Sequence, residues 1–293
     1  MTEPDQVPQP DQVPQPDQVP QGDQVPQGVD PTRPSPARLY DYYLGGTHNL
    51  PVDRELGDRF KAAVPDLEDG VWANRSFHQR AARWLAAEAG IRQFVDIGSG
   101  LPTRSNTHEA VQRVAPTARV VYVDHDPMVA AYASQLLTGD GTTAVVTADL
   151  REPDTVLTAP ALRALIDFAQ PVGLLMTAVL HFVSDESDPR GLVARYLDAC
   201  APGSYLALSH FTADAMPPRA VQAGRDLYDR ATESIHPRSR VEIGRFFEGL
   251  ELVPPQPGAE PALSFVGVWG AEDPEVADSD GARGLYCGVG RRP

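Results

Sequence analysis

Glycines and carboxylates placed at the predicted ends of strands are the residues of this sequence best suited to chemistry. An apolar run over residues 94–97 predicts a buried strand, and it stops at Gly98-Ser99-Gly100. Glycine lets the backbone turn sharply there and lets a ligand approach closely, because it has no Cβ. A strand, a glycine turn and a helix in succession hold nucleotide-containing cofactors at the carboxyl edge of parallel sheets.

The residues that flank this turn indicate which cofactor it would bind. A dinucleotide fingerprint needs a third glycine and free amides for the pyrophosphate, whereas this chain has Thr103 at that position, preceded by Pro102, which lacks an N–H. Asp96 would also place a carboxylate beside the phosphate charges. That carboxylate suits the ammonium and sulfonium groups of S-adenosylmethionine, so the turn favours this cofactor over a dinucleotide.

The next two predicted strands also end in carboxylates. Asp124 ends the second strand and Asp149 the third, so both would meet a ligand at the carboxyl edge of the sheet. We predict that Asp124 accepts hydrogen bonds from both ribose hydroxyls and that Asp149 accepts one from the adenine amino group. The neighbouring His125 and Leu150 are predicted to line the same site. Helix capping and turn formation are the alternative roles of the two aspartates.

The fourth predicted strand supplies the candidate for catalysis. It ends at Ala178 and is followed by His181. This edge would face the methyl group of the cofactor, so the Ala178 backbone is a candidate lining group and His181 a candidate base. A structural, hydrogen-bonded histidine is the alternative. No Gly-x-Ser-x-Gly elbow of a hydrolase occurs. We expect no metal site, since metal-ligand spacing is absent among the other histidines: His48, His78, His108, His125, His210 and His236.

Strands and helices alternate from residue 93 onward, which predicts a doubly wound, mostly parallel α/β sheet. The predicted parallel strands are 93–97, 119–123, 144–147, 172–179 and 205–209. The main predicted helices between and after them are 127–137, 159–168, 189–199, 214–232 and 239–248. A closing antiparallel hairpin, and with it a seven-stranded Rossmann-like sheet with an antiparallel C-terminal strand, is predicted from the segments 250–253, 263–269 and 285–289.

Two regions precede the cofactor-binding domain, which we predict to be 93–293. Residues 4–27 are built from a proline-rich hexapeptide repeat, which cannot bury enough apolar surface to offset its ordering entropy. We therefore predict a disordered tail over 1–34. Residues 35–92 predict a helical extension with helices at 36–44, 51–64 and 74–89.

The helical extension contains side chains that could cover the cofactor. Arg75 could pair with the methionyl carboxylate, and Gly45-Gly46 could act as a hinge. Simple packing of these helices on the sheet is the alternative. The candidates for this lid are Tyr40, Tyr43, Asn49, Asn74 and Arg75.

Composition restricts the partners and the compartment. The formal charge of −15 at pH 7 argues against a nucleic-acid backbone or an anionic membrane as the main partner. Cys200 and Cys287 lack metal or redox spacing and are expected to be buried free thiols. The sequence shows no signal-peptide pattern and no apolar run near the ~18 residues of a transmembrane helix. We expect a soluble, cytoplasmic protein, and its oligomeric state stays open.

Taken together, the motifs resemble a known class of enzyme. The 94–103 motif, Asp124, Asp149 and the edge of the fourth strand resemble the class I S-adenosylmethionine-dependent methyltransferases. Within this class the chain resembles one subgroup more specifically, the actinobacterial S-adenosyl methyltransferase family formerly classified as a domain of unknown function. The resemblance to this subgroup lies in the stretches 37–46, 74–75, 96–103 and 178–182. The resemblance covers roughly 35–293. It implies the class I fold with the cofactor over the glycine turn, and it does not supply the methyl acceptor.

We therefore expect an S-adenosylmethionine-dependent methyltransferase that acts on an unidentified, small-molecule acceptor. The cofactor would supply the electrophile, and the protein would supply positioning and, where the acceptor must lose a proton, a base. A non-catalytic S-adenosylmethionine-binding or regulatory protein is the alternative, and it would lack an acceptor pocket. An NAD-dependent oxidoreductase is a third hypothesis, which Pro102 and Thr103 disfavour.

Overall fold

The computed structural model describes residues 25–103, 105–132, 135, 137, 139, 141–214 and 218–293. The repeat up to residue 24, for which we predict disorder, lies outside the described residues. The rest of the predicted tail, 25–34, contacts the folded domain. Val29 packs against a small apolar cluster that contains Leu101, and Arg33 donates a hydrogen bond to the carbonyl of Ala231 (2.5 Å). These contacts belong to the part of the predicted tail that the structure describes, and the tail boundary at residue 34 stays a prediction.

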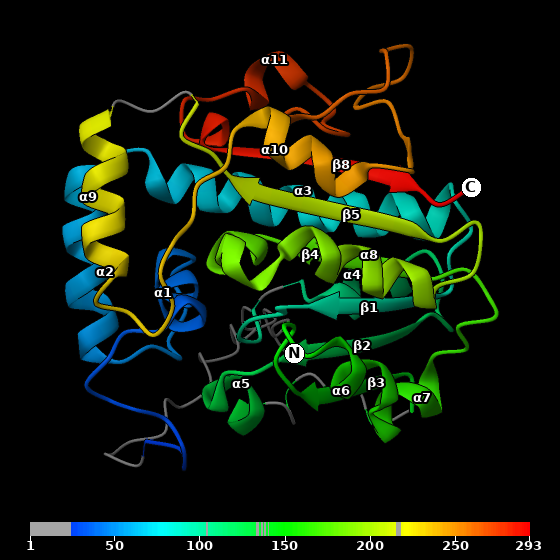
Figure 1. Ribbon diagram of the computed structural model, residues 1–293, viewed down its shortest axis with the longest axis horizontal. Helices are drawn as coiled ribbons and strands as arrows, with labels where there is room; N and C mark the ends of the chain where they lie inside the picture. Colours follow the sequence, from blue (N-terminus) through cyan, green and yellow to red (C-terminus); the bar gives the residue numbers. More distant parts are fainter. Residues whose placement is uncertain are drawn as a thin grey trace, which may run out of the picture.

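A mixed sheet forms the centre of the molecule (Figure 1). The order of strands across it is β3-β2-β1-β4-β5-β8-β6, and β7 pairs with β8 beside this path. The pairs among β1 to β5 are parallel, whereas β8 is antiparallel to β5, β6 and β7. The described residues thus form eight strands, where we predicted seven. The strands are β1 (Gln93–Ile97), β2 (Arg119–Asp124), β3 (Thr143–Thr147), β4 (Gly173–Thr177), β5 (Tyr205–Phe211), β6 (Glu251–Leu252), β7 (Ser264–Phe265) and β8 (Leu285–Arg291).

The strand order creates a switch point at the carboxyl edge of the sheet. From β1 the chain proceeds outward through β2 and β3, and it then returns to place β4 on the other side of β1. The connections that leave β1 and β4 therefore diverge, and ligands of doubly wound sheets bind in the crevice between them. The glycine turn after β1 lies at this point, as the sequence predicts.

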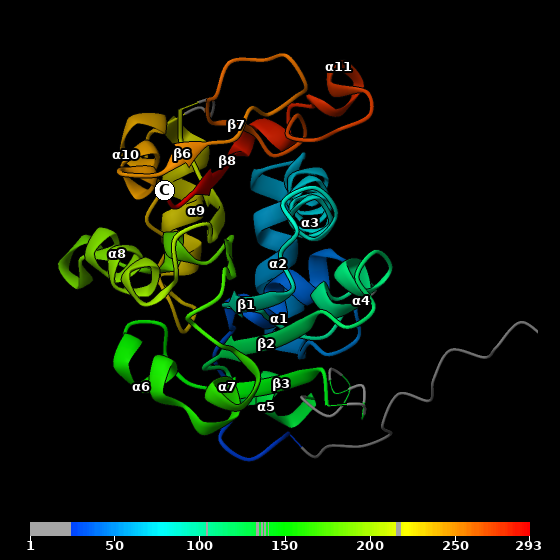
Figure 2. The same cartoon turned by 90° about the vertical axis from the view of Figure 1, so that its right-hand side faces the viewer.

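Helices cover both faces of the sheet. Figure 2 shows α3 (Leu67–Ala87) and α4 (Thr107–Gln112) on one side, with α6 (Pro153–Thr158) and α8 (Pro189–Ala199) on the other. Alternate residues of β1 enter the two cores: Phe94 packs with Phe77 beneath α3, while Val95 and Ile97 pack with Tyr196 beneath α8. This period-two pattern explains why the strand is apolar on both faces.

Further helices stand at the carboxyl edge of the parallel strands. Figure 1 shows α1 (Pro36–Tyr43), α2 (Pro51–Ala63) and α9 (Pro218–Tyr228) beyond the tips of β1, β4 and β5. Helix α1 begins after Ser35, whose hydroxyl accepts a hydrogen bond from the N–H of Arg38 (3.3 Å). A third apolar core joins these helices to the sheet edge and includes Leu39, Tyr43, Leu56, Phe60, Val71, Tyr228 and Ile235.

Several predicted helix boundaries are wrong. Helix α3 begins at Leu67, before the predicted start at residue 74, and it therefore contains Gly70. Glycine is needed at position 70 because a Cβ there would lie 2.6 Å from the carbonyl oxygen of Gly281. The helix predicted at 159–168 is limited to α7 (Pro160–Leu165), since Ala159 leaves helical geometry. The remaining helices are α5 (Pro127–Tyr132), α10 (Arg240–Gly244) and α11 (Pro274–Ala277), and the described 3-10 turns are Leu180–Phe182, Asp185–Ser187, Arg245–Phe247 and Ala282–Gly284.

Across the described ranges, no helix is both long enough and apolar enough to span a membrane.

Candidate functional site

A cavity of about 180 Å³ lies at the switch point, beneath α1 and α3. Tyr43 lines it, whereas Asn49 is absent from its described lining. The cavity therefore brings together the predicted site residues, although their individual roles stay predictions. It is lined by every residue predicted to bind the cofactor or to act in catalysis: Tyr40, Asn74, Arg75, Asp96, Gly98, Ser99, Gly100, Asp124, His125, Asp149, Leu150, Ala178 and His181.

The segment around Asn49 is tied to a buried carboxylate. Asp41 accepts hydrogen bonds from the N–H of His48 (2.9 Å) and from the side-chain amide of Asn49 (2.8 Å). A Cβ on Gly46 would lie 2.0 Å from an oxygen of Asp41, so glycine is required there for close packing. This contact explains why residue 46 is a glycine even if the segment does not move. A hinge at Gly45-Gly46 therefore stays a prediction.

The turn after β1 depends on backbone angles that glycine adopts readily. Gly98 and Gly100 have φ angles of 69° and 66°, in the left-handed region. A Cβ on Gly98 would lie 2.2 Å from the side chain of Val179, whereas one on Gly100 would meet nothing within 4 Å. Gly98 therefore permits close packing against the segment after β4, and Gly100 leaves open space above the turn.

Asp124 is hydrogen-bonded directly to this turn. Its Oδ2 accepts from the N–H of Gly100 (2.8 Å) and its Oδ1 from the N–H of Asp126 (2.9 Å). Burial raises the pKa of this carboxyl, and the two backbone donors oppose that effect. Each carboxylate oxygen has two lone pairs, so Asp124 keeps acceptor capacity on its cavity side. This arrangement suits a ligand with two neighbouring hydroxyls.

Asp126, two residues further on, has a structural set of partners. Its Oδ1 accepts from the N–H of Met128 (2.8 Å) at the start of α5, and its Oδ2 accepts from the hydroxyl of Ser35 (2.6 Å). The N–H of Ser35 donates to Asp53 (3.0 Å), which also forms a buried ion pair with Nε of Arg38 (2.8 Å). These bonds fasten α1 and α2 to the loop that carries Asp124.

Asp96 belongs to a buried chain of hydrogen bonds. The hydroxyl of Thr107 donates to Asp96 (2.6 Å), and the ring nitrogens of His78 bond to Thr107 (2.7 Å) and to Thr177 (2.8 Å). Because Thr107 gives its hydrogen to Asp96, His78 must donate through Nε2 and accept through Nδ1. Burial raises the pKa of Asp96 to about 6 and lowers that of His78 to about 3. A neutral His78 thus links β1 to β4 beneath the cavity.

Asn74 joins the helical extension to the ends of β4 and β5. Its Oδ1 accepts from the hydroxyl of Ser209 (2.5 Å), whose oxygen accepts from the N–H of Ala178 (3.0 Å). Its amide nitrogen donates to the hydroxyl of Tyr40 (2.8 Å), which donates to the carbonyl of Val71 (3.3 Å). Ala178 has a φ of 53°, which is unfavourable for a residue with a Cβ, and this network holds it there.

The loop after β3 forms a charged rim at the cavity. Arg151 pairs with Asp149 (2.7 Å) and with Glu233 (3.1 Å), and Glu233 lies 3.4 Å from Nε2 of His125. The hydrogen bond to Glu233 raises the pKa of His125. The segment after α9 is thereby connected to the loops after β2 and β3.

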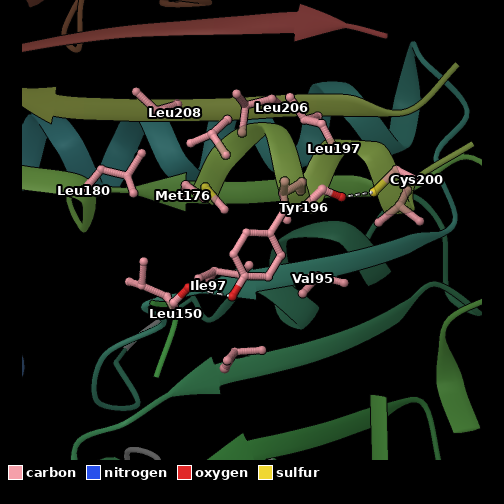
Figure 3. Packing of buried hydrophobic residues seen from close by; sticks show 14 of the residues in the cluster. Val95, Ile97, Leu150, Met176, Leu180, Tyr196, Leu197, Cys200, Leu206 and Leu208 are labelled. Carbon is pink, nitrogen blue, oxygen red and sulfur yellow. Dashed lines mark hydrogen bonds between the residues drawn. The ribbon is translucent and has the colours of Figure 1, made fainter. Parts of the chain in front are cut away.

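The backbone of the same loop is fixed from the opposite side. The Tyr196 hydroxyl of α8 donates to the carbonyl of Leu150 (2.9 Å), and Figure 3 shows the Tyr196 side chain pointing from α8 toward Leu150. The thiol of Cys200 donates in turn to the carbonyl of Tyr196 (3.3 Å). Cys200 and Cys287 are both free and buried, which confirms the expectation from their spacing.

His181 lies in the turn after β4 and lines the cavity. Its Nδ1 accepts a hydrogen bond from the N–H of Phe211 (3.2 Å), so the neutral ring carries its proton on Nε2. Burial, together with the nearby His210, Arg238 and His236, lowers the pKa of His181 well below its ordinary value. In this tautomer the ring offers a donor to the cavity and lacks the free lone pair that a base requires.

A family model described as S-adenosyl methyltransferase matches residues 22–293. This range contains the glycine turn, the strand ends and the helices above them. The chain belongs to this S-adenosyl methyltransferase family. The crystal structure of a DUF574-family protein from Streptomyces avermitilis MA-4680 is 42% identical over 89% of this chain and 98% of that one, with a TM-score of 0.83. A proposed methyltransferase from Thermobifida fusca YX is 40% identical over 91% and 97%, with the same TM-score of 0.83.

Membership of the S-adenosyl methyltransferase family makes S-adenosylmethionine the cofactor and excludes the NAD hypothesis. The cavity fits such a ligand, because two of its polar groups lack a partner. Nε of Arg75 and the hydroxyl of Ser99 are buried without a hydrogen bond among the described residues. Another nitrogen of Arg75 donates to the carbonyl of Ser105 (2.9 Å), in the loop that follows the glycine turn. Within the described ranges no cluster of three or more His, Cys, Asp or Glu side chains could hold a metal ion.

The sequence analysis missed several residues that line the cavity of this methyltransferase. His78 was considered only as a metal ligand, although its spacing from Asn74 and Arg75 places all three on one helix face. Phe60, Tyr228 and Glu233 carry no local signal, because they come from α2 and from the segment around α9. Only the folded chain brings them to the carboxyl edge of the sheet.

Proposed function

We propose that this chain transfers a methyl group from S-adenosylmethionine to a small-molecule acceptor bound in the same cavity. The observation that carries the proposal is the continuation of the cavity past Ala178 and Asn74. It reaches a region that we call the aromatic end, beneath α1, α2 and α9. A pocket of about 180 Å³ with such walls suits a small ligand and not a polymer. The aromatic end is lined by Tyr43, Phe60, Phe182, Phe211 and Tyr228.

In this proposal the other part of the cavity, which we call the cofactor end, positions S-adenosylmethionine. The cofactor supplies an electrophilic methyl group. Asp124 accepts from the ribose hydroxyls and Asp149 from the adenine amino group, between His125 and Leu150. Arg75 pairs with the methionyl carboxylate through its unpartnered Nε. Orienting the methyl group toward the aromatic end is then the main contribution of the protein.

The proposal also assigns roles to the regions of the chain. Residues 93–293 carry most of the cofactor end, to which 35–92 contribute Arg75, and 35–92 also act with α9 as the cover of the aromatic end. A non-catalytic protein that only senses the cofactor would have no use for the aromatic end, which favours catalysis over that alternative. The formal charge of −15 supports a small acceptor and not a nucleic acid.

Two measurements test the proposal. Calorimetric titration with S-adenosylhomocysteine should show binding, and absence of binding would overturn the methyltransferase function. The protein is then incubated with methyl-labelled S-adenosylmethionine and a cell extract separated by ultrafiltration. Label should appear in the fraction that passes the filter, in a compound that chromatography separates from S-adenosylmethionine itself. Label confined to retained macromolecules would overturn the small-molecule acceptor, and binding without transfer to either fraction would favour the regulatory alternative.

A further inference from the structure

We infer that the methyl acceptor is an aromatic molecule with an acidic hydroxyl that is already ionised when it binds, and that His181 donates a hydrogen bond to this anion. The inference rests on the proposed function and deepens it, because it names the chemical class of the acceptor. His181 then acts as a positioning and specificity-determining donor, which differs from the base expected from the sequence.

The two ends of the cavity are separated by the order of the strands. The loops after β2 and β3 lie on one side of the glycine turn, and those after β4 and β5 lie on the other. Asp124 and Asp149 belong to the first side, whereas His181 and Phe211 belong to the second. A cofactor held at the carboxylates therefore leaves the second side for the acceptor.

The second side is apolar and aromatic. Phe60 and Phe182 both pack against the ring of Tyr228, with centroids 5.5 Å and 5.6 Å apart. Such walls favour a flat, aromatic ligand. Among the described lining residues, the acidic and cationic side chains have their partners at the turn or at the loops after β1, β2 and β3: Arg75, Asp96, Asp124, Asp126, Asp149, Arg151 and Glu233. A cationic acceptor would find no counter-charge here.

No described group at this end can serve as a base. Both ring nitrogens of His78 are bonded to threonine hydroxyls. Nδ1 of His181 is occupied by the N–H of Phe211. The tyrosine hydroxyls of Tyr43 and Tyr228 are buried, and burial raises the pKa of each. An acceptor that needed the enzyme to remove its proton would therefore react poorly in this site.

Two residues that line this end carry donors instead. Nε2 of His181 has no hydrogen-bond partner in the described part of the chain. Tyr43 is 4% exposed and its buried hydroxyl makes no hydrogen bond of proper geometry there either; burial and the nearby Tyr228 hydroxyl raise its pKa. Buried donors without acceptors favour a ligand that brings an acceptor, and hydrogen bonds to an anion are the stronger kind. An aromatic oxyanion meets both requirements.

The transfer step balances without a base from the protein. The acceptor hydroxyl loses its proton to solvent before it binds. The acceptor oxygen then forms a bond to the methyl carbon while the carbon–sulfur bond of the sulfonium breaks, and the bonding pair remains on sulfur. The products are a neutral aryl methyl ether and S-adenosylhomocysteine.

The binding of 4-nitrophenol to the protein loaded with S-adenosylhomocysteine tests the inference, because the absorbance of this probe distinguishes its phenolate from its phenol. We expect binding of the phenolate, with the pKa of the bound probe lower than that of the free probe. His181→Phe and Tyr43→Phe should each weaken phenolate binding by roughly 10- to 150-fold. His181→Gln, which keeps a donor, should restore part of the loss.

Controls separate the inference from the proposed function. Tyr42→Phe removes a hydroxyl that bonds to Asp58 at the surface (2.6 Å), and it should leave probe binding unchanged. Melting temperatures show whether each variant folds. If S-adenosylhomocysteine binds while 4-nitrophenol does not bind, or binds as the neutral phenol, the inference is overturned and the proposed function stands. Preferred binding of benzylamine would overturn it too. Failure of S-adenosylhomocysteine itself to bind would overturn the proposed function and the inference with it.

Discussion

The cofactor end and the aromatic end of the cavity are built in opposite ways. At the cofactor end, carboxylates lie near the carboxyl ends of β1, β2 and β3, and side chains bond to neighbouring backbone, as Asp124 does to Gly100 (2.8 Å). At the aromatic end, rings arrive from α1, α2, α9 and the segments after β4 and β5, and they are held mainly by apolar packing. Local hydrogen bonding thus stabilises the cofactor end, while packing between distant segments stabilises the aromatic end.

The cover of the aromatic end is nevertheless fastened to the cofactor end at specific points. Ser35 bonds to Asp126 (2.6 Å), and Asn74 bonds to Ser209 (2.5 Å). Both bonds cross from the helical extension to the edge of the sheet. The two ends therefore differ in how each is stabilised. Substitutions at each end should show which residues affect the stability of the fold and which affect cofactor affinity.

The largest expected effect concerns the cover. Asp53→Ala removes the partner of Arg38 inside a buried ion pair and leaves a buried charge, which should lower the free energy of unfolding by about 3–5 kcal/mol. Glu55→Ala on the same helix breaks an exposed pair with Arg59 (2.6 Å) and should cost at most about 1 kcal/mol. Chemical denaturation of both variants checks this. Equal losses would mean that the buried pair does not secure the cover.

A smaller effect is expected at the glycine turn. In Gly98→Ala, a left-handed alanine and a clash with Val179 (2.2 Å) act together, and the free energy of unfolding should fall by about 2–5 kcal/mol. Gly90→Ala is the matched control, because Gly90 has a φ of 71° with nothing within 4 Å of a Cβ. It should cost only about 1–2 kcal/mol. Similar denaturation midpoints for the two variants would show that packing against Val179 is unimportant.

Cofactor affinity should depend on Asp124 more than on its neighbour. If its carboxylate accepts from the ribose hydroxyls, Asp124→Ala should weaken S-adenosylhomocysteine binding by roughly 10- to 200-fold. Asp126→Ala removes bonds to Met128 and Ser35 and should lower stability more than affinity. Calorimetric titration and thermal melts of both variants distinguish the two roles. The reverse pattern would mean that we have assigned the ribose to the wrong carboxylate.

The smallest expected effect is a dependence of affinity on pH. Burial raises the pKa of Asp96 to about 6, and a cationic ligand group beside it would lower that pKa, so binding releases a proton. Affinity for S-adenosylhomocysteine should therefore rise by up to about tenfold from about pH 5 to about pH 7 and then level off. Asp96→Asn should flatten the profile. His125→Gln should not, and if it does, the charged rim and not Asp96 is the origin.

The prediction of the fold succeeded where the pattern was local and long enough. The five parallel strands were located to within a few residues, because each is an apolar run that stops at a polar or glycine-containing turn. The helix predicted at 74–89 was started too late, because α3 begins at Leu67 and contains Gly70. In the structure Gly70 is the point where the helix approaches Gly281. A Cβ on Gly70 would lie 2.6 Å from the carbonyl oxygen of Gly281. The role of that glycine lies in a tertiary contact.

By itself, the sequence determined the cofactor end, because residues that follow parallel strands must meet at one edge whatever the rest of the chain does. Tertiary structure alone decided the aromatic end, since Phe60 and Tyr228 are adjacent only when α2 packs on α9. It also decided the tautomer of His181. The N–H that occupies its Nδ1 belongs to Phe211 of β5, and a hydrogen bond between separate segments leaves no trace in the spacing of residues. The same histidine is therefore a candidate base in the sequence and a donor in the fold.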